Sequence, residues 1–227
     1  MLTPGPYVDS AAPGVRQFTE EALAGCAGAS ATERAVALFA AVRDRIRYDP
    51  YVITLDPEAY RASAVAAQEA AFCVPKAILL TACLRAAGIP AVVGFADVRN
   101  HLNTPRLAAL MGTDLFIYHG YVRLWLGEHA FKVTPAFNSS LCARFGVRPL
   151  EFDGTADALF HEYDAHDRRH MEYVRDRGTF DEPPIEEMLA AFRATYPLLG
   201  EIAARRSAQA ADAAFAAPAS TTEGIST

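Results

Sequence analysis

The segment from Cys73 to Ala87 constrains the fold more than any other part of the chain. It is apolar on almost every side of a helix, with Pro75 in its first turn and Gly88 and Pro90 just beyond its end. Proline suits a first turn because its missing N–H has no helical partner there, and glycine commonly ends a helix. A helix that is apolar all round is buried. The sequence therefore predicts a central helix enclosed by the rest of the protein.

A chain of 227 residues, 52% of them hydrophobic, is long enough to enclose such a helix. A domain of this size buries about 70% of its unfolded surface. We therefore expect one domain with short extensions, which needs no cofactor, metal or disulfide for stability. The four cysteines form no Cys-x-x-Cys pair, so neither a zinc knuckle nor a dithiol redox site is expected.

Charge patterning excludes two classes of partner. The net charge is −6, from 21 Lys and Arg against 27 Asp and Glu, and the basic residues are scattered, which argues against nucleic-acid binding. The longest stretch between charged residues is eleven, whereas a membrane-spanning helix needs roughly 18 apolar residues. No basic residue precedes Arg16, so the start does not have the pattern of a secretory signal. We expect a cytoplasmic protein that does not cross a membrane.

Two further helices have clear signals. Ser30 and Glu33 have the spacing of a capping box, which predicts the start of a helix that ends near Tyr48. Apolar residues at helical spacing from 185 to 196 predict a final amphipathic helix, ended by Pro197. The segment 207–227 is rich in Ala, Ser and Thr without periodicity, which is typical of a disordered tail.

The strands are expected between these helices. Residues 91–98 and 116–126 have strand character, and the turn Gly127-Glu128 leads into a hairpin partner at 130–134, so the sheet is expected to be antiparallel here. Residues 99–115 are expected to form a long polar connection. Residues 139–183 are mixed and polar, and no element is predicted in them.

Cys73 is the candidate nucleophile. A thiol at a helix start is close to unpaired backbone N–H groups and to the positive end of the helix dipole, and both favour the thiolate. The alternative is a packed, inert thiol, which is the more frequent state of an isolated cysteine. Of the other cysteines, Cys83 is expected to be a core residue.

His119 is the candidate base. On the strand 116–126 it shares one face with Tyr121. A turn at Gly127-Glu128 places Tyr121 opposite Thr134, so Thr134 becomes the diagonal neighbour of His119 on that face. A nucleophile, a base and an orienting group from distant segments can thus meet. The alternative is an ordinary core histidine.

Several segments resemble the transglutaminase-like superfamily. They are FCVPKA at 72–77, LRAAGIPA at 84–91, and HGYV at 119–122 followed by FKVTP at 131–135. The resemblance implies a papain-like α+β fold, in which the buried helix carrying the cysteine packs on an antiparallel sheet carrying the histidine. It also implies Cys73 as nucleophile, His119 as general base and acid, and amide substrates: peptide bonds or Gln side chains of peptides and proteins.

The third catalytic position departs from the superfamily pattern. That pattern has Asp before Pro, whereas this chain has Thr134. A threonine can accept a hydrogen bond from the histidine but cannot stabilise imidazolium by charge. Cysteine enzymes tolerate a neutral third member, as in Cys-His-Asn sites. Asp97, if its strand lies beside His119, and Asn138 are alternative orienting groups.

The expected reaction is acyl transfer through a Cys73 thioester, resolved by water in a hydrolase or deamidase and by an amine in an acyltransferase. The N–H of Cys73 is a candidate oxyanion donor and Gln68 is a second. Two other functions stay open. One is a catalytically silent peptide-binding or interaction protein of the same fold. The other is a metal-binding protein that uses the segment from His161 to His170.

The expected organisation has four parts. An irregular to short helical lead covers residues 1–29, and the transglutaminase-like core covers residues 30–138. An extension over residues 139–206 contains the last amphipathic helix and packs on the core. The tail covers residues 207–227.

Overall fold

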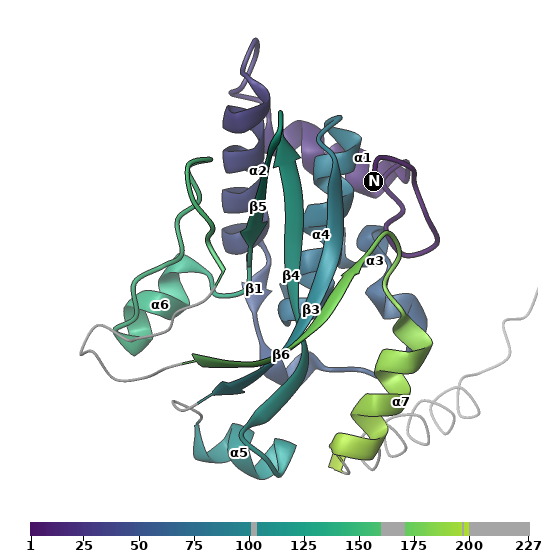
Figure 1. Cartoon of the computed structure of the whole chain (residues 1–227), viewed down its shortest axis with the longest axis vertical. Helices are drawn as coiled ribbons and strands as arrows, with labels where there is room; N and C mark the ends of the chain where they lie inside the picture. Colours follow the sequence, from purple (N-terminus) through teal and green to yellow (C-terminus); the bar gives the residue numbers. More distant parts are fainter. Residues whose placement is uncertain (101–103, 160–170, 197, 200–227) are drawn as a thin grey trace, which may run out of the picture.

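The computed structural model describes residues 1–100, 104–159, 171–196 and 198–199. Helices and strands are interspersed along the chain (Figure 1). The helices are α1 (Pro13–Ala22), α2 (Ala31–Arg45), α3 (Ala62–Ala66), α4 (Cys73–Ala86), α5 (Pro105–Met111), α6 (Ser139–Phe145) and α7 (Ile185–Thr195). The strands are β1 (Arg47–Tyr48), β2 (Ala70–Ala71), β3 (Ala91–Asn100), β4 (Leu115–Leu126), β5 (His129–Val133) and β6 (Met171–Phe180).

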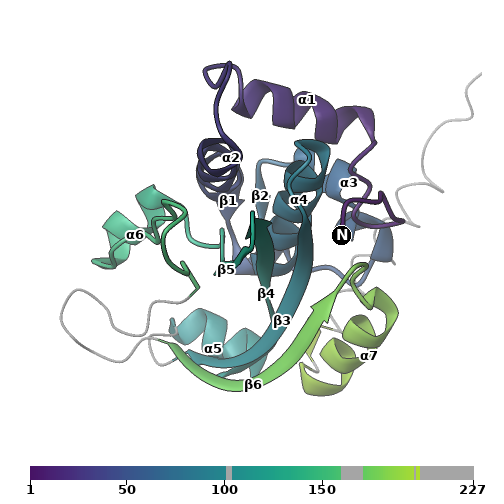
Figure 2. The ribbon, with the colours of Figure 1, turned by 45° about the horizontal axis from the view of Figure 1, so that its top comes forward.

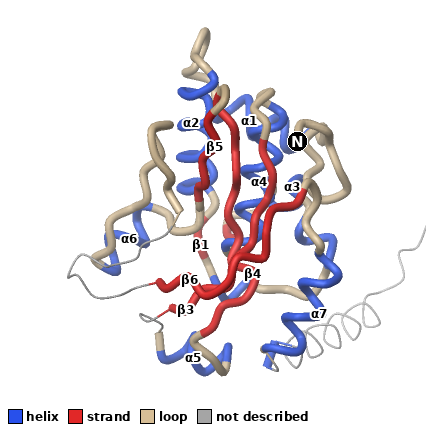
Figure 3. The backbone as a smooth tube through the Cα atoms, in the orientation of Figure 1, coloured by secondary structure: helices blue, strands red, loops and turns tan. Residues whose placement is uncertain are grey.

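The four long strands form one antiparallel sheet with the order β5-β4-β3-β6 (Figure 3). The short strands β1 and β2 pair in parallel beside it. The expected hairpin is confirmed, since Leu126 pairs with His129 and Val122 with Val133. This mixture of helices with a curled antiparallel sheet confirms the α+β class.

The helix α4 lies between the sheet and the three helices α1, α2 and α3 (Figure 2). Every side chain from Cys73 to Arg85 is buried. The prediction of a central, enclosed helix is therefore confirmed. Its first turn meets the middle of β4, and this junction carries the candidate site.

The start of α2 and the buried face of α7 also agree with the sequence, whereas α2 ends at Arg45, a few residues before the end expected near Tyr48. Ser30 and Glu33 form both hydrogen bonds of the capping box before α2. The apolar face of α7 is buried, as the spacing of Ile185, Met188 and Phe192 predicts. The tail 207–227 lies outside the described residues. Among the residues that are described, no helix is both long and apolar enough to cross a membrane.

Two segments differ from expectation. The expected connection 99–115 contains the end of β3 and the helix α5, which starts at Pro105 and is capped by the hydroxyl of Thr104. The segment 139–183 contains α6 and β6. Strand β6 is mostly exposed and interrupted by bulges, so its residues lack the alternation that reveals a strand.

Candidate active site

Cys73 is the first residue of α4, and its sulfur lies against β4. The backbone N–H groups of Gly120, Val74 and Cys73 itself favour the thiolate at this position. Strand β4 can lie this close to α4 because Gly120 has no side chain. A Cβ at this position would lie 3.0 Å from the Cys73 carbonyl oxygen and 2.9 Å from the Val74 Cα. The helix start expected from the sequence is therefore present, with a strand backbone beside it.

The ionisation of Cys73 differs from expectation. The three N–H groups and the charge of Lys76 lower the pKa of the thiol, as a helix start should. Burial has the larger effect and raises the pKa to about 11, since Cys73 is only 9% exposed. The effect expected from the helix start is therefore present, but burial outweighs it, and the thiol by itself is protonated at neutral pH.

His119 and Thr134 line the same cavity, whose volume is about 10 Å³. Leu126 pairs with His129, and the same register places Tyr121 opposite Thr134. The expected neighbourhood of His119 and Thr134 is therefore confirmed. Both are buried, 4% and 3% exposed, and the cavity is about large enough for one water molecule.

Thr134 is held in place through its main chain. Its N–H donates to the carbonyl oxygen of Ala158 at 2.8 Å. Within the part of the chain that the structure describes, its hydroxyl oxygen is buried without a hydrogen-bond partner. A buried hydroxyl in this state is costly, and it faces the cavity that His119 shares.

Asp97 lies on the neighbouring strand but on the other face of the sheet. Ala96 pairs directly with His119, so these two share a face and the next residue, Asp97, points away from it. The carboxylate of Asp97 accepts the N–H of Tyr118 at 3.1 Å and forms two bonds with Arg177, of 2.5 and 2.9 Å. Asp97 is therefore occupied elsewhere and is not the orienting carboxylate of His119.

Asn138 is occupied as well. Its amide oxygen accepts the N–H of Tyr48 at 3.1 Å, and its amide nitrogen donates to the hydroxyl of Ser140 at 2.6 Å. These bonds join the start of α6 to β1. Thr134 is thus the one candidate for the third position that shares a cavity with His119. Gln68, the candidate second oxyanion donor, is exposed.

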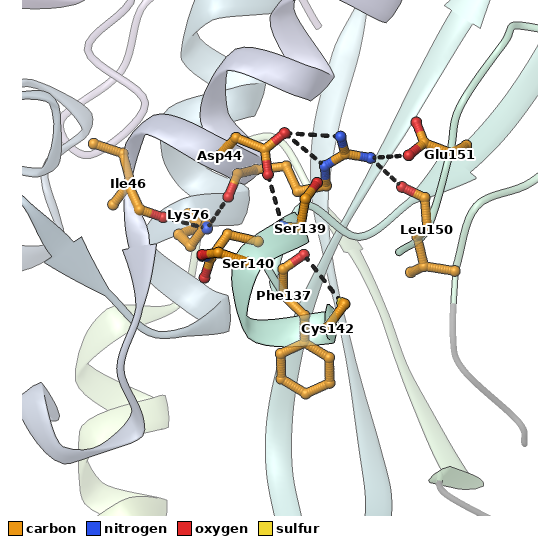
Figure 4. Close-up of polar contacts among 11 residues, drawn as sticks. Asp44, Ile46, Lys76, Phe137, Ser139, Ser140, Cys142, Leu150 and Glu151 are labelled. Atoms are coloured by element: carbon orange, nitrogen blue, oxygen red, sulfur yellow. Dashed lines mark hydrogen bonds and ion pairs between the residues drawn. The ribbon is translucent and has the colours of Figure 1, made fainter. Parts of the chain in front are cut away.

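The sequence did not single out Lys76, which lies one turn after Cys73 and is fully buried. Its ammonium donates to the carbonyl oxygens of Arg43 and Ile46, at 2.8 and 2.5 Å (Figure 4). Burial lowers the pKa of Lys76 to about 7. The signal in the sequence was a charged residue in the first turn of an otherwise apolar helix, and the role of Lys76 is to tie α4 to the end of α2.

The contacts around Lys76 extend to the surface. Arg43 forms ion pairs with Asp44 at 2.8 Å and with Glu151 at 2.9 Å. Asp44 also accepts the N–H of Ser139 at 2.8 Å, which attaches α6 to the same place (Figure 4). The base of the candidate site is therefore a polar network between α2, α4 and α6.

The expected metal segment, His161 to His170, falls outside the described residues. Among the residues that are described, no group of three or more His, Cys, Asp or Glu side chains could hold a metal ion.

These features define a class of protein: an α+β protein in which a cysteine opens a buried helix beside a sheet strand that carries a histidine. A family model described as the transglutaminase-like superfamily matches residues 16–134. The match covers more than half of the chain, so the chain belongs to the transglutaminase-like superfamily. Comparison with curated proteins and with solved structures gave no match.

Proposed function

We propose that this protein is a thiol enzyme that acts on amide carbonyls through a Cys73 thioester. The observation that carries the proposal is the junction of α4 and β4, where the first turn of α4, which begins with Cys73, packs on Gly120, the residue that directly follows His119. Membership of a superfamily that commonly contains cysteine enzymes supports the same conclusion. In this proposal His119 is the general base and acid, and Thr134 orients its imidazole.

The first half of the reaction forms the thioester. The proton of Cys73 moves to His119, and the sulfur attacks the carboxamide carbon, which becomes tetrahedral. The N–H of Cys73 can donate to the developing oxyanion. His119 then gives its proton to the leaving amine, the C–N bond breaks, and the acyl group remains on the sulfur.

The second half releases the acyl group. His119 takes a proton from water or from an acceptor amine, whose oxygen or nitrogen attacks the thioester carbon. The C–S bond breaks and the thiol is regenerated by the same proton. Water makes the enzyme a hydrolase or deamidase, and an amine makes it an acyltransferase.

Pairing with the His119 imidazole lowers the high pKa of the Cys73 thiol in this proposal. A thiolate formed together with imidazolium is stabilised by the opposite charge, which burial strengthens. The three backbone N–H groups that lower the pKa of the thiol stabilise the same charge. The pair, rather than the cysteine alone, is the reactive unit in this proposal.

The test is intact-mass analysis of the full-length protein with a library of amides and esters. We expect an acyl adduct on the wild-type protein that is absent from Cys73→Ala and His119→Ala. Cys83→Ala is the matched control, because Cys83 lies on the same helix and is fully buried. An adduct that persists without Cys73 would overturn the proposal.

The low exposure of Cys73 favours a second candidate, a catalytically silent protein of the same fold that binds peptides. Cys73 is 9% exposed, the cavity lined by His119 and Thr134 has a volume of about 10 Å³, and the third position has no charge. This candidate predicts that no acyl donor modifies the protein and that His119→Ala leaves the reactivity of Cys73 unchanged.

A further inference from the structure

The strand β4 is irregular immediately before His119. Tyr118 has a φ of +54°, a backbone conformation that residues other than glycine rarely adopt. Ile117 and Tyr118 together lie opposite the single residue Asp97 of β3, since Ala96 pairs with His119 and Val98 with Phe116. Such a bulge turns the following side chain in a new direction. The orientation of His119 therefore depends on how Tyr118 is held.

Tyr118 is held by two hydrogen bonds and one cation–π contact, besides the packing of its ring on Phe95 and Phe192. Its N–H donates to Asp97 at 3.1 Å, and its hydroxyl donates to the carboxylate of Glu187 at 2.7 Å. The guanidinium carbon of Arg177 lies 4.1 Å from the centre of its ring, which is a cation–π contact. Because Arg177 also forms two bonds with Asp97, it fixes both the tyrosine ring and the group that binds its backbone.

A second bulge places Arg177 there. Phe95 pairs with Gly178 and Ala96 with Asp176, so Arg177 is an extra residue of β6 beside β3. The bulge of β4 lies opposite Asp97, whereas the bulge of β6 lies opposite the step from Phe95 to Ala96 and brings Arg177 to the carboxylate of Asp97. Two bulges that meet at one carboxylate form a defined local structure next to the candidate base.

Tyr196, directly after α7, holds the same part of β4. Its hydroxyl accepts the N–H of Ile117 at 2.7 Å and donates to the carbonyl oxygen of Leu115 at 3.1 Å. It is 1% exposed. Buried backbone groups at a bulge need such partners, and here one phenol supplies both.

These three side chains come from β6 (Arg177), from α7 (Glu187) and from the residue directly after α7 (Tyr196). They lie beyond residue 134, where the match to the superfamily model ends. The strain at Tyr118 persists only while its surroundings hold it. The part of the chain that follows the matched core therefore holds the backbone that presents His119.

We propose that β6 and α7 position His119 for catalysis, with Arg177, Glu187 and Tyr196 as positioning residues that act through the backbone of residues 115–118. None of them contacts the substrate in this proposal. Its effect on rate rests on the proposed function, whereas its effect on the geometry of His119 does not. The two can therefore be tested separately.

The variants are Arg177→Met and, as a milder change, Tyr196→Phe, which removes one oxygen atom. Arg177→Lys tests rescue by a retained positive charge. Arg175→Met is the matched control, because Arg175 is exposed, lies on the same strand, and has no ion pair or side-chain hydrogen bond in the described structure. Circular dichroism and cooperative thermal unfolding confirm that each full-length variant is folded.

Two readouts are used. The first is the rate of Cys73 alkylation by iodoacetamide as a function of pH. The His119-dependent rate is the difference between wild type and His119→Ala, and we expect Arg177→Met and Tyr196→Phe to lower this rate by about tenfold. The second is the titration of the His119 imidazole by NMR, assigned with His119→Ala. We expect the chemical shifts of the imidazole and the midpoint of its titration to change in Arg177→Met and in Tyr196→Phe. Both should return toward the wild-type values in Arg177→Lys and remain at those values in Arg175→Met.

The outcomes separate this inference from the proposed function. If the wild-type alkylation depends on His119 but Arg177→Met and Tyr196→Phe leave the rate and the imidazole signals unchanged, positioning is overturned and the enzyme proposal stands. If the wild-type alkylation does not depend on His119, the enzyme proposal fails, and the imidazole signals decide on positioning. If Arg177→Met does not fold, Tyr196→Phe gives the answer alone.

Discussion

Gly120 of β4 packs directly on Cys73 in the first turn of α4, and the missing side chain of Gly120 is what lets strand β4 and helix α4 meet there. A Cβ on Gly120 would lie 2.9 Å from the Val74 Cα. That atom belongs to the backbone of a buried helix, so it cannot move aside as a flexible side chain can. The position of Cys73 relative to strand β4, which carries His119, thus depends on one glycine.

Gly120→Ala is expected to push α4 and β4 apart at the site. Overpacking of this kind costs about 1–3 kcal/mol in the free energy of unfolding, which urea denaturation measures. We also expect loss of the His119-dependent reactivity of Cys73. The control is Gly25→Ala, where no atom lies within 4 Å of the added Cβ. Equal stability and reactivity in Gly120→Ala and wild type would contradict the described junction.

Thr134→Val is expected to leave stability unchanged or raise it slightly. The hydroxyl of Thr134 is buried and has no hydrogen-bond partner among the described residues, so the substitution removes a polar group whose burial destabilises the fold. If Thr134 orients His119 during catalysis, acyl-adduct formation falls while the free energy of unfolding does not. A fall in both, or in neither, contradicts this role.

Thr134→Asp is expected to preserve or raise activity, because a carboxylate restores the charge that the superfamily pattern has at this position. A negative charge beside His119 favours imidazolium, so the midpoint of the imidazole titration should rise. The NMR titration and the rate of adduct formation measure the two effects. If activity collapses while the fold is intact, Thr134 has a task that a carboxylate cannot perform.

Lys76 is expected to make stability depend on pH. Its pKa is about 7 in the folded protein and about 10.4 for an unfolded lysine, so between these values the unfolded chain binds more protons. The stabilisation linked to this group is therefore complete above about pH 10.4 and is lost as pH falls to 7.

The measurement is the difference in unfolding free energy between wild type and Lys76→Met at two pH values. We expect the advantage of the wild type to grow by about 1–3 kcal/mol between pH 7 and 9. The variant also leaves the carbonyl oxygens of Arg43 and Ile46 without their donor. A difference that is constant or shrinks with pH would show that Lys76 stays charged.

Local signals were sufficient to predict the core of the fold. The apolar run of α4, the capping box of α2 and the hairpin turn each depend on neighbouring residues. The same hairpin register predicted that His119 and Thr134 meet. Strand β6 was missed because its bulges and exposure remove the alternation, and α5 was missed because Thr104 and Pro105 start it inside a polar stretch.

The rest of the site depends on tertiary contacts that no local pattern encodes. The first-turn position of Cys73 indicated a lowered thiol pKa, yet enclosure by other segments raises it to about 11. Asp97 was a reasonable partner for His119 until the sheet register placed it on the opposite face. The role of Arg177 became visible only with the two bulges that meet at Asp97.

The most direct test of the central claim is the rate of Cys73 alkylation by iodoacetamide across about pH 5 to 11. It is followed by peptide mass mapping in a Cys26→Ser background, because Cys26 is the most exposed of the four thiols. A nucleophile–base pair predicts a plateau near neutral pH that is lost in His119→Ala. If the alkylation rates of wild type and His119→Ala follow the same pH dependence and rise only toward pH 11, the nucleophile–base pair is contradicted.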